Sequence, residues 1–162
     1  MRGVQGAASR GVALARQYLV SLEPDSQLHD VSDDPRFQHR GVDLLWECPG
    51  KAPLGIEVKA DRNARRGNFF FELVSNFEKD TPGCFLYSEA DLLVYVFIET
   101  REVHCLPLSD TRTWFLAHAS DYELRHTQTR TGPVLYTTVG AIVPVSDVVS
   151  GVRAARRAVL DV

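Results

Sequence analysis

An unbroken apolar run, residues 93–98, is the segment of the chain best suited to burial. A run of this length that is rich in β-branched and aromatic side chains is typical of a buried strand. It belongs to a strand-like stretch, residues 92–99, and a second such stretch, residues 102–108, follows after Thr100 and Arg101 alone. So short a connection predicts that the two stretches pair as a β-hairpin.

The elements around this hairpin indicate an α/β fold. Residues 7–22 have apolar side chains at helical spacing (Val12, Ala15, Leu19 and Leu22), and Pro24 ends the predicted helix. Further along, we expect a loop at 30–34, strands at 68–74, 122–128 and 134–138, and helices at 110–119 (capped by Ser109 or Asp110) and 146–160. This order predicts one domain over residues 1–162, with a mixed central β-sheet flanked by helices.

Composition excludes several classes of protein. Of the 162 residues, 44% are hydrophobic and 24% charged, which is enough apolar material for a real core. No apolar stretch approaches the roughly 20 residues that span a bilayer, and the first residues lack a secretory signal. We therefore expect a soluble, cytoplasmic protein with no membrane partner. Its three cysteines form no CxxC pair, which argues against a disulfide framework and a zinc knuckle.

A second hairpin is predicted where the turn Pro49-Gly50-Lys51-Ala52-Pro53 separates strand-like residues 42–48 and 54–60. If this hairpin is symmetric about Gly50, Asp43 lies directly opposite Glu57. Facing side chains have Cβ atoms about 4.5–5.5 Å apart. Lys59 lies two residues beyond Glu57, so the strand period places both side chains on one face.

Two carboxylates at this separation repel each other, and a divalent cation between them reverses the sign of the interaction. Asp43, Glu57 and the carbonyl of Val58 offer oxygen ligands of the kind that Mg²⁺ or Mn²⁺ prefers. Such a cation lowers the pKa of a water and neutralises charge on a phosphodiester. Lys59 is placed to position or deprotonate that water, or to stabilise the transition state. We therefore predict Asp43, Glu57 and Lys59 as catalytic residues.

A single aspartate, a gap and then Glu-x-Lys on a hairpin resemble the PD-(D/E)XK nucleases, which include many restriction enzymes and the archaeal Holliday junction resolvases. The resemblance covers residues 41–95, and the predicted helix ahead of them fits it. It implies a restriction-endonuclease-like fold and the hydrolysis of DNA with Mg²⁺ or Mn²⁺. It also implies that Asp43 and Glu57 bind the metal and that Lys59 is the catalytic lysine.

Two positions differ from the family pattern. Val42 replaces the proline before the aspartate, and the first helix offers Arg10, Arg16 and Gln17 where many members have a glutamate. Gln17 is a candidate neutral ligand or water anchor; if an acid is required there, the domain binds DNA without cutting it. Glu72, in an apolar strand, is either an auxiliary active-site acid or a charge on an edge strand.

Basic residues flank the predicted site on both sides in the sequence. They are Arg40 before the first strand of the hairpin, and Arg62, Arg65 and Arg66 after the second. Arginine side chains beside a metal are suited to hold phosphates, so we predict that these residues contact DNA. The alternative is an ordinary solvated, charged loop. The net charge of −3 argues mildly against a large basic footprint.

The sequence contains no obvious module for reading base sequence. This favours a structure-selective nuclease such as a junction resolvase, or a short-range exonuclease. A junction resolvase is expected to be a homodimer, since it cuts two symmetric strands. Other hypotheses are a catalytically inactive nuclease-like module that binds DNA or protein, and a purely structural domain. In the last case Asp43, Glu57 and Lys59 form an exposed salt-bridge ladder, which contributes little to stability.

Overall fold

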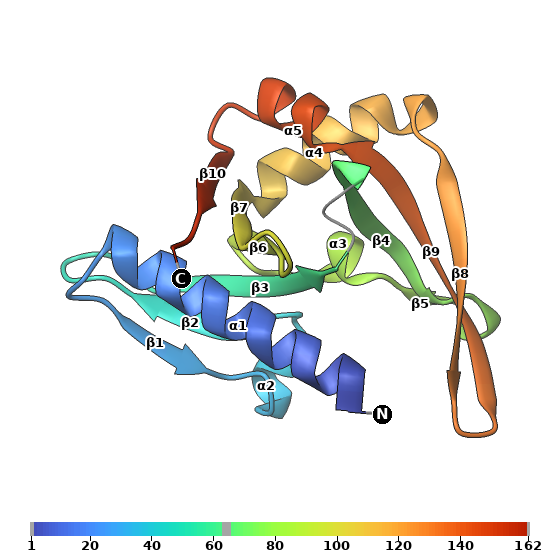
Figure 1. Ribbon diagram of the computed structural model, residues 1–162, viewed down its shortest axis with the longest axis horizontal. Coiled ribbons are helices and arrows are strands. Elements are labelled where there is room, and N and C mark those ends of the chain that lie inside the picture. The colour runs from blue at the N-terminus through green and yellow to red at the C-terminus, as the bar shows by residue number, and fades with distance from the viewer. Residues whose placement is uncertain (1, 63–65, 162) are drawn as a thin grey trace.

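The computed structural model describes residues 2–62 and 66–161. It is a mixed α/β fold that contains two β-sheets (Figure 1). The first sheet is mixed, with the order β1 (Gln27–Asp30), β2 (Leu44–Glu47), β3 (Leu54–Asp61), β6 (Leu92–Phe97), β7 (Glu102–Pro107) and β10 (Arg156–Val159). The second is antiparallel, with the order β5 (Thr81–Pro82), β4 (Asn68–Asn76), β9 (Val134–Pro144) and β8 (Leu124–Thr131). The mixed sheet was predicted, whereas the second sheet was not.

The β2–β3 hairpin has the predicted register. Leu44 pairs with Ile56 and Trp46 pairs with Leu54, so the hairpin is symmetric about Gly50. β3 then runs parallel to β6, from Ile56 beside Leu92 to the end of both strands. A parallel pair needs a long crossover connection, and here it contains β4, β5 and the short helix α3 (Cys84–Tyr87).

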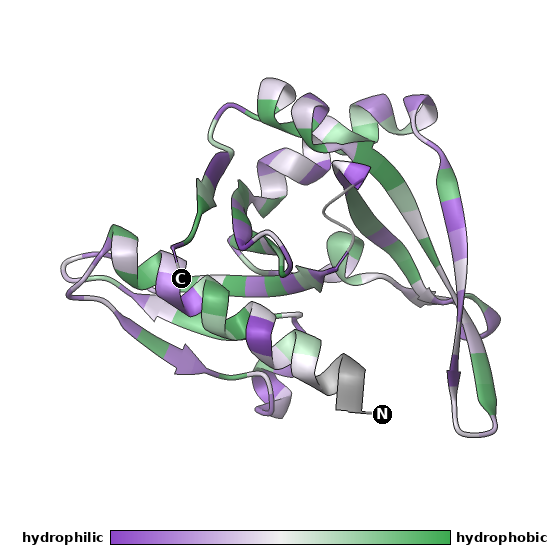
Figure 2. Ribbon diagram, viewed as in Figure 1, coloured by the Kyte–Doolittle hydropathy of each residue, from purple (hydrophilic) through white to green (hydrophobic). Residues whose placement is uncertain are grey.

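The apolar run at 93–98 is buried on both faces of the first sheet, as its composition predicts. Val94 and Val96 pack with Ile56 beneath the helix α1 (Arg2–Leu22). Tyr95 and Phe97 pack on the opposite face against Phe69 of the second sheet. Figure 2 shows that apolar residues are concentrated where these layers meet. The functional consequence is that polar residues on the Tyr95 side of β3 lie between the two sheets.

Helix α1 lies across β3, and Figure 1 shows it in front of the first sheet. Leu14, Ala15, Tyr18 and Leu19 are buried, and the helix ends at Leu22 before Pro24, as predicted. Leu22, the last residue of the predicted apolar stripe, is 42% exposed. No helix within residues 2–62 and 66–161 has the length and apolar character to cross a membrane.

Gly11 is the point of closest approach between α1 and β3. A Cβ atom on Gly11 would lie 2.5 Å from the Cβ of Ala60, closer than two such atoms can pack. Glycine therefore lets the helix backbone rest directly on the strand. This contact brings the first turns of α1 beside residues 58–60.

The C-terminal segment departs most from the sequence prediction. The helix expected at 146–160 is α5 (Val145–Gly151), and it is followed by β10, which pairs with β7. In β10 the guanidinium of Arg157 donates to both carboxylate oxygens of Glu102, at 2.9 and 3.1 Å. Pairing with an existing sheet edge thus overrides the helical pattern of the apolar residues.

Smaller differences concern the ends of elements. β1 extends to Asp30, and α2 (Pro35–Gln38) begins at Pro35 with Asp34 as its N-cap, so residues 30–34 are only partly a loop. The helix predicted at 110–119 is α4 (Leu108–His118), and its N-cap is Pro107 rather than Ser109 or Asp110. None of these differences moves the β2–β3 hairpin.

Candidate functional site

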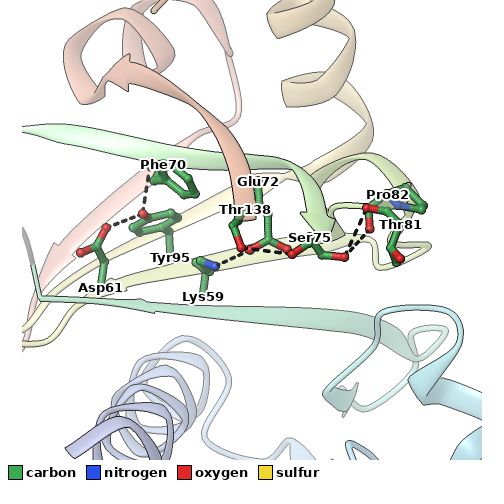
Figure 3. Close-up of polar contacts among 9 residues, drawn as sticks. All are labelled: Lys59, Asp61, Phe70, Glu72, Ser75, Thr81, Pro82, Tyr95 and Thr138. Carbon is green, nitrogen blue, oxygen red and sulfur yellow. Dashed lines mark hydrogen bonds and ion pairs between the residues drawn. The ribbon is translucent and has the colours of Figure 1, made fainter. Parts of the chain in front are cut away.

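Polar side chains of β3 project between the two sheets. Glu57 and Lys59 line one small cavity together with Glu72 of β4 and Cys84 of α3. Figure 3 shows Lys59 rising from β3 towards Glu72, with the lysine Nζ atom 3.4 Å from Oε2 of the glutamate. Glu57 and Lys59 therefore lie on the same face of β3, as predicted, and this face is turned towards the second sheet.

Asp61, at the end of β3, continues this polar row. The hydroxyl of Tyr95 donates a hydrogen bond to Oδ2 of Asp61 at 2.7 Å and accepts one from the backbone N–H of Phe70 at 3.1 Å (Figure 3). Tyr95 is fully buried, and burial is the first cause that raises its pKa, so the hydroxyl keeps its proton. The two bonds fix the end of β3 against β4.

Asp43 lies just before β2 and is tied to β3 by two hydrogen bonds. Its backbone N–H donates to the carbonyl of Ile56 at 2.8 Å, and its Oδ2 atom accepts from the N–H of Val58 at 2.8 Å. Asp43 lines a cavity of about 400 Å³ that Val58 and Lys59 share with Asp30 and the first turns of α1. Lys59 thus borders both the cavity that holds Asp43 and the one that holds Glu57.

The charge of Asp43 acts on Glu57. Burial raises the pKa of Glu57 to about 8, and the negative charge of Asp43 is the next cause. Burial also raises the pKa of Asp43, with a further contribution from Asp30, while the hydrogen bond from Val58 acts in the opposite direction. The charge of Asp43 therefore reaches Glu57. The pairing of β2 with β3 ends at Leu44 and Ile56, however, so the two acids are near each other without forming the directly facing pair that was predicted.

The amine of Lys59 is held in its charged form. Burial alone lowers its pKa, but the carboxylate of Glu72 and its other neighbours outweigh that effect, so the net shift is upward. Glu72 comes from a strand of the other sheet, which explains why the sequence indicates its polarity but not its partner.

Two further residues, Cys84 and Asp30, lie near the site. Cys84 lies against Glu57, and burial raises the pKa of its thiol to about 12, so it is a neutral group in this cluster. It reaches the site because α3 begins close to β4: a Cβ on Gly83 would lie 2.3 Å from the carbonyl oxygen of Glu72. Asp30 borders the cavity of Asp43 and accepts hydrogen bonds from Ser32.

The acidic side chains at the site can be compared with the ligands that the predicted Mg²⁺ or Mn²⁺ needs. In residues 2–62 and 66–161, no three His, Cys, Asp or Glu side chains converge to hold a metal ion. Mg²⁺, however, is commonly held by one or two carboxylates, with waters and substrate phosphates completing its shell. Asp43 and Glu57 are two half-buried acids, and the charge of Asp43 raises the pKa of Glu57, so they fit this open kind of site.

The remaining predicted residues are placed as follows. Gln17 is exposed on α1, which borders the cavity of Asp43 through Ala7, Ala8 and Val12 instead. Arg40 forms an exposed ion pair with Glu89 at 2.7 Å. Arg62 is exposed in the bend after β3, and Arg66 is exposed and borders a further groove beside Lys59. Arg65 lies outside the described residues. The fold thus brings Glu57, Lys59 and Glu72 to one cavity and Asp43 to an adjoining one that Lys59 also borders, but it does not bring Gln17 or Arg40 to either.

The chain was compared with protein-family models, curated proteins and solved structures. No match was found in any of the three. The function is therefore inferred from the side chains above and their geometry.

Proposed function

We propose that this chain is a divalent-cation-dependent nuclease of the PD-(D/E)XK type that hydrolyses phosphodiester bonds of DNA. The observation that supports the proposal is the β2–β3 hairpin, which pairs Leu44 with Ile56 and so brings Asp43 near Glu57, with Lys59 two residues further along β3. Repulsion between two half-buried acids does not favour the folded chain, so a role in cation binding explains their placement better than a role in stability.

Each residue of the site has a distinct part in the proposed reaction. Asp43 is oriented by the N–H of Val58, and with Glu57 it would hold the cation. When bound, Mg²⁺ or Mn²⁺ supplies activation of a water and neutralises charge on the phosphodiester. The Lys59 ammonium, steered by Glu72, donates hydrogen bonds to the phosphate oxygens and stabilises the negative charge that develops there.

A nuclease-like module that binds DNA without cutting it is the second candidate. It is favoured by the lining of the Asp43 cavity, to which α1 contributes small and apolar residues rather than an acid. The two candidates differ in one measurable property, which is the breakage of a phosphodiester bond in the presence of a cation.

The test is incubation of the purified chain with supercoiled, linear, single-stranded and branched DNA, with Mg²⁺, with Mn²⁺ or with EDTA. We expect cutting with a divalent cation and none in EDTA, and a loss of about 10²–10³-fold in rate for Lys59→Ala. Asp43→Asn should also abolish cutting. Glu47→Gln, an exposed acid at the far end of β2, is the matched control and should cut normally.

Two outcomes would contradict the nuclease. Cutting that persists in EDTA or in Asp43→Asn would come from another site or a contaminant. Binding of DNA with no cutting under any cation would instead support the inactive module.

A further inference from the structure

A groove that Asp43 does not border opens beside Lys59. It has a volume of about 390 Å³ and lies between the end of β3 and one face of the second sheet. We call it the β8 groove. Its lining includes Arg125, Thr127 and Thr129 of β8, Thr138 of β9, and Asn68 and Phe70 of β4.

The strand period of β8 explains why this face is polar. Arg125, Thr127 and Thr129 alternate with His126, Gln128 and Arg130, so the first three side chains share the face that borders the groove. Figure 1 shows β8 and β9 extending past the rest of the second sheet as a long hairpin. Thr138 pairs with Thr127 and lies beside Glu72 in Figure 3, where its hydroxyl donates to the carbonyl of Ser75 at 3.1 Å.

Positive charge is concentrated in this groove although the chain carries a net charge of −3. Lys59, Arg66 and Arg125 border it, and among the described residues of its lining Asp61 is the one acid. Lys59 is also paired with Glu72, so the two arginines carry most of the charge that is open to a ligand. The guanidinium of Arg125 is 3.6 Å from Glu123 in an exposed pair, which is too weak to immobilise it. Within the described residues, Arg66 forms no ion pair.

We propose that the β8 groove binds the sugar–phosphate backbone of one nucleic-acid strand next to the phosphate that Lys59 contacts. This inference rests on the proposed nuclease function and deepens it. Arginine side chains bind phosphates, and hydroxyl and amide side chains donate to phosphate and sugar oxygens. Phe70 adds an aromatic surface among them, and positive charge interleaved with an aromatic ring is the combination that binds unpaired strands.

The size of the groove selects a single strand over a duplex. Its volume is that of a pocket for a small molecule, which accommodates about one nucleotide. A duplex is too wide to enter, so base pairs next to the cleaved bond must open. Single-stranded, frayed or branched DNA is therefore the expected substrate class.

The test measures binding rather than cutting. The full chain is titrated into a fluorescent single-stranded oligonucleotide in EDTA, and the dissociation constant is determined over a range of salt concentrations. Arg125→Gln and Arg66→Gln, on different elements, should each weaken binding by about 3–10-fold and reduce the salt slope by about 0.7. Arg130→Gln removes the same charge from the other face of β8, and it should leave binding within about twofold.

Melting temperatures of the three variants identify any loss of folding, and Arg66 provides an independent result if a change in β8 unfolds the second sheet. The proposal is overturned if Arg130→Gln weakens binding as much as Arg125→Gln. It is also overturned if duplex binds as tightly with the same dependence on Arg125, or if a mononucleotide binds while the strand does not.

The groove and the nuclease fail in different ways. If the chain never cuts DNA but Arg125→Gln loses strand binding, the proposed role of the β8 groove is supported and the proposed nuclease function is not. If the chain cuts DNA with Mg²⁺ but neither arginine substitution affects strand binding, the nuclease function is supported and the proposed role of the β8 groove is not.

Discussion

The Nζ atom of Lys59 lies 3.4 Å from Oε2 of Glu72, and this ion pair joins β3 of the first sheet to β4 of the second. The two side chains are 30% and 17% exposed, so both charges are largely withdrawn from water. Removing one partner from such a pair leaves the other charge poorly solvated. The placement of the proposed catalytic lysine therefore depends on how the two sheets pack.

The first prediction concerns this ion pair. Glu72→Gln keeps the shape of the side chain but removes its charge, and it should lower the free energy of unfolding by about 1–3 kcal/mol in a denaturant titration. Glu89→Gln breaks the exposed pair with Arg40 and should cost less than about 1 kcal/mol. Equal losses in the two variants would mean that Lys59 does not depend on Glu72.

A second prediction separates the cation site from stability. Glu57→Gln removes a half-buried acid whose charged form Asp43 disfavours, so without divalent cations the variant should melt at or above the temperature of the wild type. Mn²⁺ should raise the melting temperature of the wild type, because a ligand that binds only the folded chain stabilises it. The variant should lose this rise, whereas Glu47→Gln should keep it. A rise of equal size in Glu57→Gln would place the cation elsewhere.

Local patterns predicted the part of the site that lies on one hairpin. The register of Leu44 with Ile56 follows from the turn around Gly50, and the strand period then puts Glu57 and Lys59 on a common face. The buried run around Tyr95 was equally clear, because apolar side chains on both faces of a strand leave no exposed side. In each case the residues that decide the structure are near one another in the chain.

The parts that sequence patterns missed depend on distant pairings. Glu72 meets Lys59 only because β4 belongs to a second sheet, and Cys84 reaches Glu57 by a long crossover between β3 and β6. Arg157 forms a strand rather than a helix because β7 offers it a free edge and the acid Glu102. Local propensity carries no information on partners of this kind.

The third prediction is a dependence of stability on pH that arises at His104. Its side chain is fully buried, its Nε2–H donates to Oε1 of Glu102 at 2.6 Å, and its Nδ1 has no hydrogen-bond partner within the described residues. Burial lowers the pKa of His104, although the bond to Glu102 partly opposes that effect. The folded chain therefore keeps this ring neutral at pH values where the unfolded chain protonates it.

Below the ordinary histidine pKa of about 6.5, His104 binds a proton in the unfolded chain but stays neutral in the folded chain. The free energy of unfolding should therefore fall as the pH decreases. The slope of this fall, measured by denaturant titration, should be smaller in His104→Leu than in the wild type. His39→Leu, at an exposed position, is the control and should keep the wild-type slope. The slope is the relevant readout, since loss of the Glu102 bond lowers stability at every pH. An unchanged slope in His104→Leu would contradict the prediction.

The last prediction compares two glycines of α1. A Cβ on Gly11 would lie 2.5 Å from the Cβ of Ala60, whereas one on Gly6 would meet no atom within 4 Å. Gly6→Ala should therefore stabilise the chain by about 0.5–1 kcal/mol through helix propensity alone. Gly11→Ala should destabilise it by about 1–3 kcal/mol because the helix must move away from β3. That movement widens the cavity of Asp43, so cutting should slow in Gly11→Ala and not in Gly6→Ala. If both variants are more stable, α1 does not touch β3 at this point and cannot form the wall beside Asp43.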